Sequence, residues 1–450
     1  MSNQSTENLK TYRLTKPKKH HFFGFHDLLI SNKKGDKVLS LQVDDIDHPP
    51  RIGQKANIGF IDDDSNEFHY IASTTAWNFP QGARLQWVGD TDKIIFNDKV
   101  GEDWGARLFD ANSKLEVDNF PYPIHVLDAD SMTGFSINYS RLHRLGGYGY
   151  IGFDDKYKDA GAPIHDGINK INLITKRVEL IVSIADIANF EMSQGSGHHY
   201  LTHLSLNPSC TRIAFLHRYR LEDGGEMTRL MTLGVDGSDL KCLILGFLSH
   251  FDWKKDGQIL IWGRKNQAIA NLRDSKLLSN SVLSKVIKLV KPIVRKVIGS
   301  SNIMSMHFML INESNQQVEQ ISHDVINSDG HPMINPINRD WMINDTYPNK
   351  EGVRFLMLYN FKTNTRVDLG KYRMLDKVPN TKIVEEFSLV LDPSIRSVFK
   401  AEQYAFTRSG LHCDLHPRWL ADGKSVAFDS IHEGMRQIYI IDVSNILEGS

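Results

Sequence analysis

Five histidines occupy the same position of a recurring strand pattern in this chain. They are His26, His203, His250, His331 and His416. In the clearest copy, HPRWLADGKSVAFDS at residues 416–430, the histidine lies three residues before an aromatic, and an Asp-Gly turn leads to an apolar second strand. Two further copies carry Arg84 and Ile124 at this position. Because equivalent strands of a repeat point the same way, we expect the imidazoles to converge on one centre.

Neutral imidazoles from neighbouring strands suit a divalent transition metal such as Mn, Fe, Ni or Zn, which needs nitrogen ligands about 2.0–2.2 Å away. The most economical set is His250, His331 and His416. Asp414 or His412, in the segment LHCDLHP, can add a ligand from the same strand edge. We therefore predict a metal site formed by His250, His331, His416 and Asp414.

Other roles for the same histidines stay open. His26 and His203 flank the metal set and can act as acid and base, each worth about a hundredfold in rate when well placed. Without a metal, the histidines can bind a sugar carboxylate or tie each inner strand to the backbone of a neighbouring blade. The filled positions run through consecutive units, and a continuous arc fits a site better than a tie needed in every unit.

Arginines lie close to this arc in the sequence pattern. Arg84 fills the histidine position of its own unit, and Arg218 and Arg220 lie in the second strand of the fourth unit. Arg141 and Arg264 lie at comparable strand ends. Guanidinium groups bind carboxylates through paired hydrogen bonds, so this gathering suggests an anionic ligand, although a single arginine is more often a salt-bridge partner.

A β-elimination beside a uronate carboxylate needs positive charge for the developing enolate and a base for the proton at carbon five. The residues we assign to catalysis are His26, Arg84, His203 and Arg218. The residues we assign to substrate binding, by charge or by stacking on a sugar, are Trp77, Arg141, Arg220 and Arg264. Tyr347 is a further aromatic candidate, whereas Asn344 and Asp345 are interpreted as turn structure at a strand end.

The elements that must position these residues form an all-β fold. Strand-rich units that recur about every 40 to 80 residues are typical of a β-propeller. The units that we count are residues 20–78, 81–122, 123–187, 199–247, 248–326, 328–375 and 408–446. We expect residues 20–446 to form a single seven-bladed β-propeller, and residues 1–19 to form a tail whose TYRLTKP strand closes the last blade.

One segment departs from the strand pattern. Residues 281–300, SVLSKVIKLVKPIVRKVIGS, place aliphatic residues at helical spacing with lysines and arginine mostly on the other side. We predict a basic amphipathic helical insertion in blade five, at 268–303. Such a helix can lie on an anionic inner-membrane surface, or its aliphatic stripe can pack on the propeller or on a second subunit.

Composition agrees with one large β-rich protein. The chain has 450 residues, 41% of them hydrophobic, and a net charge of −1, so it has no nucleic-acid footprint. Its start lacks the apolar core of a signal peptide, and it has no apolar run of about 18 residues. We therefore expect a cytoplasmic protein, held at the inner face of the membrane where the basic helix binds it. Three scattered cysteines predict no disulfide framework.

The segments HPRWLADGKSVAFDS and DGHPMINPINRDWMIND resemble the oligogalacturonate lyase family, seven-bladed propellers of the TolB-like type. That family holds manganese with histidines and cleaves uronate oligosaccharides by β-elimination, so the resemblance favours manganese and a lyase. It implies that His331 and His416 match two of the family's ligand histidines. Asp414 stands where the family has a third histidine, and Leu411 stands where it has a glutamine ligand.

The N-terminal half, with FFGFHD, TTAWNFPQGARLQWVG and SRLHRLGGYGY, is similar to a second group of propeller proteins. That group is associated with bacterial capsule and surface-polysaccharide assembly. The resemblance implies an acidic glycan as the partner. No nucleotide-binding pattern with Asp-x-Asp and no phosphate-binding glycine loop accompanies it.

We therefore predict a propeller that acts on an acidic bacterial surface polysaccharide, with a metal-assisted lyase as the leading mechanism. The first alternative is a non-catalytic scaffold that binds glycan in assembly of the polysaccharide. The second is a glycosyl hydrolase or glycosyltransferase with an unfamiliar site. Unsaturated products would separate the lyase from the scaffold, and dependence on a nucleotide sugar would identify a transferase.

Overall fold

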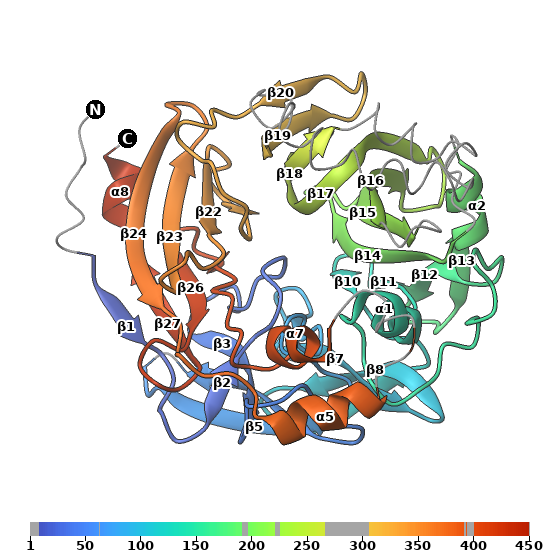
Figure 1. Cartoon of the computed structure of the whole chain (residues 1–450), viewed down its shortest axis with the longest axis horizontal. Coiled ribbons are helices and arrows are strands. Elements are labelled where there is room, and N and C mark those ends of the chain that lie inside the picture. The colour runs from blue at the N-terminus through green and yellow to red at the C-terminus, as the bar shows by residue number, and fades with distance from the viewer. Residues whose placement is uncertain are drawn as a thin grey trace. The chain divides into compact units, whose positions relative to one another are not determined.

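The structure is a computed structural model that describes residues 9–62, 64–190, 197–220, 226–265, 306–390, 393 and 400–449. The chain groups into two compact units. The first consists of residues 1–156, 169–179 and 330–450, and the second consists of residues 157–168 and 180–329. Both units are built from antiparallel strands (Figure 1).

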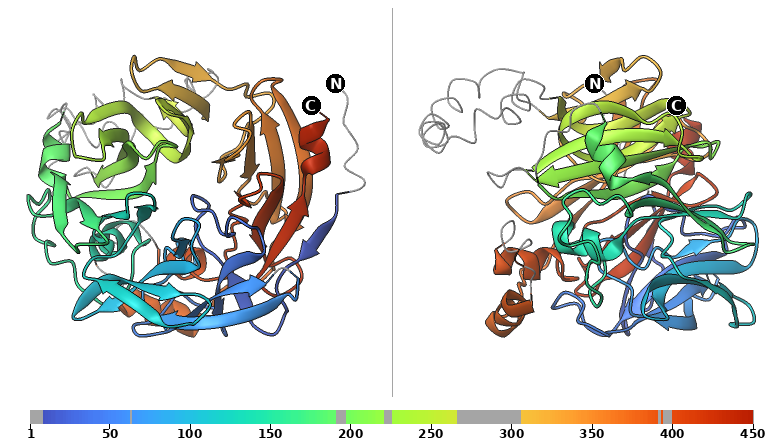
Figure 2. Two further views of the ribbon diagram at one scale, coloured as in Figure 1. Left: turned by 180° about the vertical axis from the view of Figure 1, so that it is seen from behind. Right: turned by 90° about the vertical axis from the view of Figure 1, so that its right-hand side faces the viewer.

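Four sheets of the first unit have four strands each (Figure 2). Two come from the N-terminal part of the chain: β2 (His20–Phe22), β3 (Lys37–Val43), β4 (Ala56–Asp62) and β5 (Glu67–Thr74), then β6 (Gln86–Trp87), β7 (Lys93–Val100), β8 (Asp103–Asp110) and β9 (Glu116–Phe120). One comes from the C-terminal part: β21 (Met333–Ile334), β22 (Trp341–Asp345), β23 (Val353–Asn360) and β24 (Thr365–Arg373).

The fourth sheet joins the two ends of the chain. It consists of β25 (Arg418–Trp419), β26 (Ser425–Ser430), β27 (Gln437–Asp442) and β1 (Thr11–Arg13). Strand β1 pairs with β27 in antiparallel register, with Tyr12 opposite Ile440. The N-terminal strand therefore covers an edge that would otherwise expose unpaired backbone groups.

A further sheet contains β10 (Val126–Asp128), β11 (Thr133–Ser136), β12 (Gly167–Asn172) and β13 (Val178–Ser183), and its last two strands run from one unit into the other. The second unit carries a seven-stranded sheet in chain order: β14 (His199–Leu206), β15 (Arg212–Arg220), β16 (Glu226–Gly234), β17 (Lys241–Lys255), β18 (Gln258–Lys265), β19 (His307–Asn312) and β20 (Val318–Gln320). The long strand β17 carries one register shift between Leu248 and Phe251, which includes His250, and a second between Trp253 and Lys255.

Tryptophans of the repeat make hydrogen bonds to other strands, Trp419 to the preceding sheet and Trp253 from β17 to β14 of its own sheet. Trp419 Nε1 donates a hydrogen bond to the backbone oxygen of Met333 at 3.0 Å in the first unit. Trp253 Nε1 donates to the backbone oxygen of Ser205 at 3.2 Å in the second. Both indoles are almost completely buried. The tryptophans three residues after His250 and His416 therefore pack in the core and have their one polar group satisfied.

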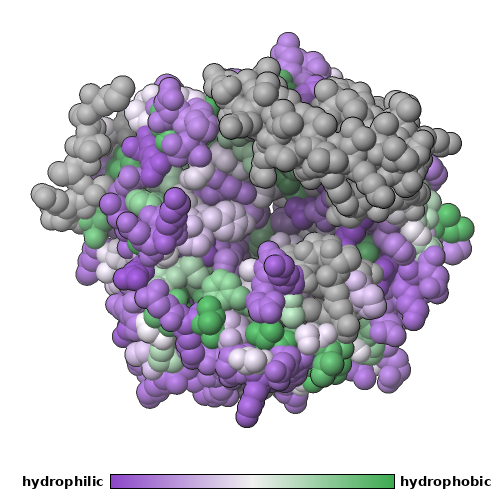
Figure 3. All heavy atoms as spheres, viewed as in Figure 1, coloured by the Kyte–Doolittle hydropathy of each residue, from purple (hydrophilic) through white to green (hydrophobic). Residues whose placement is uncertain are grey.

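The described helices are short. They are α1 (Tyr139–Gly146), α2 (Ile184–Asn189), α5 (Thr381–Val390), α7 (Ala401–Thr407) and α8 (Ser444–Glu448). Hydrophobic side chains reach the surface around α5 (Figure 3), where Val378 is 71% and Leu389 is 78% exposed. Among the described residues, no helix has the length and apolarity needed to span a bilayer. The helical insertion expected at 268–303 lies outside the described residues.

Candidate functional site

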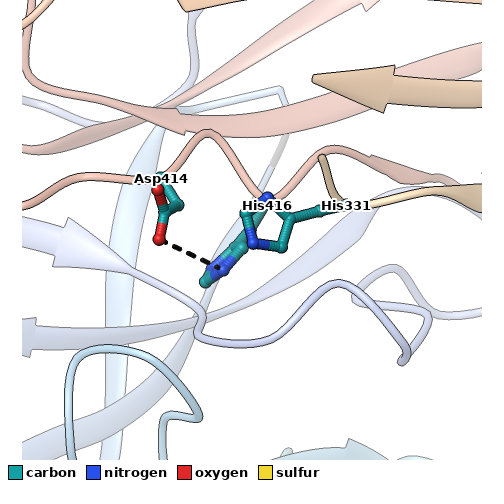
Figure 4. A group of neighbouring side chains, drawn as sticks. All are labelled: His331, Asp414 and His416. Atoms are coloured by element: carbon teal, nitrogen blue, oxygen red, sulfur yellow. Dashed lines mark ion pairs between the residues drawn. The ribbon is translucent and has the colours of Figure 1, made fainter. Parts of the chain in front are cut away.

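Two of the predicted histidines meet in the first unit with an aspartate beside them. His331 directly precedes the hairpin of β21, and His416 precedes β25 of the next sheet along the chain. Their ring centroids lie 4.3 Å apart, and the ring planes are almost perpendicular at 86°. The ligand atoms of His331, Asp414 and His416 all lie within 4.8 Å of one another (Figure 4).

Asp345 orients this pair. Its Oδ1 accepts a hydrogen bond from the backbone N of His331 at 2.7 Å and lies 2.8 Å from the ring Nδ1 of His331. Its Oδ2 accepts from the backbone N of His416 at 3.3 Å. A carboxylate can only accept, so Nδ1 of His331 carries the proton and Nε2 keeps its lone pair. A metal-binding histidine usually has this arrangement.

His416 is held as a neutral ring. The side chain is almost fully buried, and burial, together with the Coulombic effect of His331, places the pKa of His416 well below its ordinary value. Its Nδ1 has no hydrogen-bond partner among the described residues. The backbone φ of His416 is 41°, a conformation that residues other than glycine rarely adopt and that recurs in strained functional segments.

Asp414 is ionised and lies between cationic and neutral partners. Arg354 Nη1 lies 2.7 Å and His412 Nε2 lies 3.4 Å from its Oδ1, whereas His416 Nε2 lies 3.9 Å from its Oδ2. Burial alone would raise the pKa of Asp414, but the charges of His412 and Arg354 outweigh burial and bring the pKa well below its usual range. One carboxylate oxygen therefore faces His416, while the other lies beside Arg354 and His412.

Aromatic rings and a third histidine surround the cluster. The His26 ring centroid lies 5.4 Å from that of His331 and 6.3 Å from that of His416. Phe25 packs against His26 at 4.5 Å. Tyr347, whose residue surface is 40% exposed, lies 5.5 Å from His331 by ring centroids and offers an aromatic face to solvent.

The remaining two histidines lie together in the second unit. The His203 and His250 ring centroids are 6.0 Å apart. Asp329 Oδ1 lies 3.4 Å from Nδ1 of His250, and Thr202 Oγ1 lies 2.8 Å from Nδ1 of His203. The structure thus brings the five histidines into two groups, one in each unit. The predicted ligand role of His250 and the catalytic role of His203 stay predictions.

Three predicted arginines also belong to the second unit. Arg218 and Arg220 lie in β15, the second strand of their hairpin, as the sequence pattern indicates. Arg218 Nη1 is 3.5 Å from Glu226 Oε1, and the guanidinium of Arg264 lies 4.6 Å from the ring centroid of Phe247. All three side chains are partly exposed. Their catalytic and binding roles stay predictions.

Arg84 is engaged in an ion pair between two sheets. Its Nη1 and Nη2 each lie 2.8 Å from one oxygen of Asp27, and its Nε donates to the backbone oxygen of His125 at 2.8 Å. The guanidinium is fully buried. Arg84 therefore pairs with Asp27, the residue that follows His26 in the chain, and its catalytic role stays a prediction.

Two sequence interpretations need correction. Arg141 does not lie at a strand end: it belongs to helix α1, which Asn138 caps, and its buried guanidinium pairs with Asp155 at 3.2 Å. Trp77 is 1% exposed, packs against Phe22 and donates to the backbone oxygen of Gln54 at 2.8 Å. The side chain of Trp77 therefore belongs to the hydrophobic core, and stacking on a sugar would require it to leave the core.

Asp345 and Arg354 are the site residues that the sequence reading missed. The register of β21 and β22 places Met333 opposite Ile343. Continuing this register by two residues on each strand places His331 opposite Asp345. That signal was present in the hairpin pattern. Arg354 pairs with Asp414, which lies in the segment before β25, and no local pattern indicates such a contact.

Comparisons with known proteins identify structures that share the fold of this chain. No protein-family model and no curated protein matches the chain. An oligogalacturonate lyase in complex with manganese is similar at a TM-score of 0.59 and 13% identity, covering 97% of this chain and 96% of that one. The oligogalacturonate lyase VPA0088 from Vibrio parahaemolyticus is similar at a TM-score of 0.58 and 14% identity, covering 97% and 94%. At these identities the likeness shows that the chain has the β-propeller fold of these structures.

Proposed function

We propose that the protein is a metal-dependent lyase acting on an acidic polysaccharide of the bacterial surface. The observation that carries the proposal is the cluster of His331, Asp414 and His416, in which Asp345 fixes one imidazole with its Nε2 lone pair available. The likeness to an oligogalacturonate lyase in complex with manganese supports both the reaction class and manganese as the favoured ion.

The donor set fits a divalent cation. Two imidazoles and a carboxylate are ligands that manganese and zinc accept. His416 Nε2 and Asp414 Oδ2 lie 3.9 Å apart. That separation suits two ligands of one ion, because ligands about 2.0–2.2 Å from a shared ion lie no more than about 4.4 Å apart. His416 is neutral, which is the form of imidazole that binds metals.

The ion would supply positive charge beside the substrate carboxylate. The chain's own residues must then orient the sugar and move the proton. His26 lies against the cluster and is our candidate to accept the proton from carbon five. As that proton leaves, the bond between carbon four and the leaving oxygen breaks, a double bond forms between carbons four and five, and the leaving oxygen takes up a proton from solvent water. Tyr347 offers the sugar an exposed aromatic face.

Elemental analysis of the purified full-length protein tests the proposal. We compare the wild type with the double variant His331→Ala/His416→Ala and with a control that removes two exposed histidines, His165→Ala/His323→Ala. We expect about one equivalent of metal in the wild type and the control, and none in a folded cluster variant. Oligogalacturonate incubated with the metal-loaded protein should give unsaturated products that absorb in the ultraviolet.

One observation favours a second candidate, a non-catalytic glycan-binding scaffold. Arg354 already neutralises Asp414, so the cluster can be stable as an ion pair without a metal. This candidate predicts binding of acidic oligosaccharide with no unsaturated product. Absence of metal after soaking in manganese, nickel and zinc salts would favour the scaffold over the lyase.

A further inference from the structure

We infer that Arg354 sets the cation affinity of the His331–Asp414–His416 site by competing with the cation for the charge of Asp414. The inference rests on the metal site proposed above. The inference concerns the effect of Arg354 on cation affinity and does not concern the metal ligands themselves. Arg354 is therefore a positioning residue.

The ion pair between Arg354 and Asp414 is largely buried, with the two side chains 1% and 14% exposed. Arg354 is the second residue of β23 and is 1% exposed. Its Nη1 lies 2.7 Å from Asp414 Oδ1 and donates to the backbone oxygen of Thr346 at 3.3 Å. Water and salt screen such a pair weakly, so the positive charge of Arg354 acts strongly on its surroundings.

The carboxylate of Asp414 contacts both Arg354 and His416. Oδ1 faces the guanidinium, and Oδ2 faces the ring of His416 at 3.9 Å. A cation bound by His331, His416 and Oδ2 would share Asp414 with Arg354. The guanidinium withdraws negative charge from the carboxylate and repels the bound cation, so both effects weaken cation binding.

A count of charges shows how much Arg354 changes the site. Asp345 and Asp414 contribute one negative charge each, and the two imidazoles contribute none in the neutral form that binds metals. Arg354 cancels one of the two negative charges. Without it, a divalent cation would meet one positive charge fewer beside Asp414, while the charges of His412, Arg418 and Arg436 stay in place.

The test is calorimetric titration of the metal-stripped full-length protein with manganese chloride and, separately, zinc chloride. Arg354→Met removes the charge and keeps a long side chain. Arg366→Met is the matched control, because Arg366 lies on β24 of the same sheet and pairs there with Asp368. We expect Arg354→Met to bind the cation at least about tenfold more tightly than wild type, which is about 1.4 kcal/mol. Arg366→Met should equal wild type.

Arg354→Lys keeps the positive charge and should stay close to wild type in affinity. Thermal melting with and without metal gives a second readout: the metal should raise the melting temperature of Arg354→Met more than that of wild type. If Arg354→Met does not fold, Arg354→Gln keeps a polar N–H side chain without the charge and has the same expectation.

The outcomes separate the inference from the function on which it rests. Binding only in Arg354→Met, or tighter binding in it, supports the inference. Equal or weaker affinity in Arg354→Met, with metal bound by both proteins, overturns the role of Arg354 and leaves the metal site standing. No binding in either protein overturns the metal site and the inference together.

Discussion

The carboxylate of Asp345 lies 2.8 Å from Nδ1 of His331, and it accepts hydrogen bonds from the backbone N of both His331 and His416. One fully buried side chain thus holds the ring of the first histidine and the backbone of the second. The orientation of the cluster depends on this residue as much as on the ligands.

Asp345→Asn should weaken metal binding. The amide removes the charge that holds the Nδ1 proton of His331, so His331 is no longer held in the tautomer that leaves Nε2 free. We expect a loss of about 10- to 100-fold in manganese affinity, measured by calorimetric titration. Asp368→Asn, at an exposed aspartate of β24 in the same sheet, is the control and should change nothing. Wild-type affinity in folded Asp345→Asn would show that Asp345 does not position the ligand.

Arg84→Met should destabilise the protein. It leaves the Asp27 carboxylate without its bidentate partner and the His125 backbone oxygen without its donor. Breaking a buried ion pair from one side costs about 3–5 kcal/mol. Urea unfolding measures the loss in the free energy of unfolding.

The double variant Arg84→Met/Asp27→Leu separates the ion pair from the packing of Arg84. Replacing both partners of a buried pair by apolar residues is often close to neutral, so the double variant should recover most of the stability. If single and double variants lose the same amount, the pairing with Asp27 is not what Arg84 contributes.

The strand repeat made much of the fold predictable. Period-two hydrophobic segments with turns between them identified the hairpins that carry His331 and His416, and the residues three positions later, Ile334 and Trp419, pack in the core. The likeness to oligogalacturonate lyase structures confirms the β-propeller fold. The number of blades stays a prediction.

The parts that sequence reasoning missed depend on tertiary contacts. Arg141 lies between segments that look extended, but the cap at Asn138 and the buried partner Asp155 stabilise a helix there. The partner of Arg354, Asp414, is 60 residues away in the chain and lies in the segment before β25. The position of Asp345 could have been predicted from the sequence, because the hairpin register alone places it opposite His331.

His21 should make stability depend on pH. Burial, with smaller effects of His20 and Lys19, lowers the pKa of His21 to about 4. The ring is neutral between Ser40 Oγ at 3.1 Å and the Gln42 amide at 3.2 Å. In the unfolded chain the pKa is near 6.5, so below pH 6.5 the unfolded state takes up a proton that the folded state refuses. The stabilisation is complete above pH 6.5 and is lost as the pH falls toward 4.

The measurement is urea unfolding of the wild type and of His21→Gln at several pH values between 7 and 4. The difference between their free energies of unfolding should shrink by on the order of 3 kcal/mol over this range. His165→Gln, at an exposed histidine, should follow the wild type at every pH. Parallel curves for wild type and His21→Gln would rule out His21 as the origin of the dependence.

Tyr347→Ala should weaken the binding of acidic oligosaccharide without affecting the metal. The ring is exposed, lies 5.5 Å from His331 and has the guanidinium of Arg354 6.0 Å from its centroid. Aromatic stacking contributes about 0.5–1.5 kcal/mol, so we expect a loss of about two- to tenfold in affinity for trigalacturonate. Tyr122→Ala is a close control, because Tyr122 is 40% exposed, as Tyr347 is, and belongs to the loop after β9. Tyr347→Phe should keep the affinity, since stacking needs only the ring. Equal losses in the Tyr347→Ala and Tyr122→Ala variants would show that the sugar does not stack at the histidine cluster.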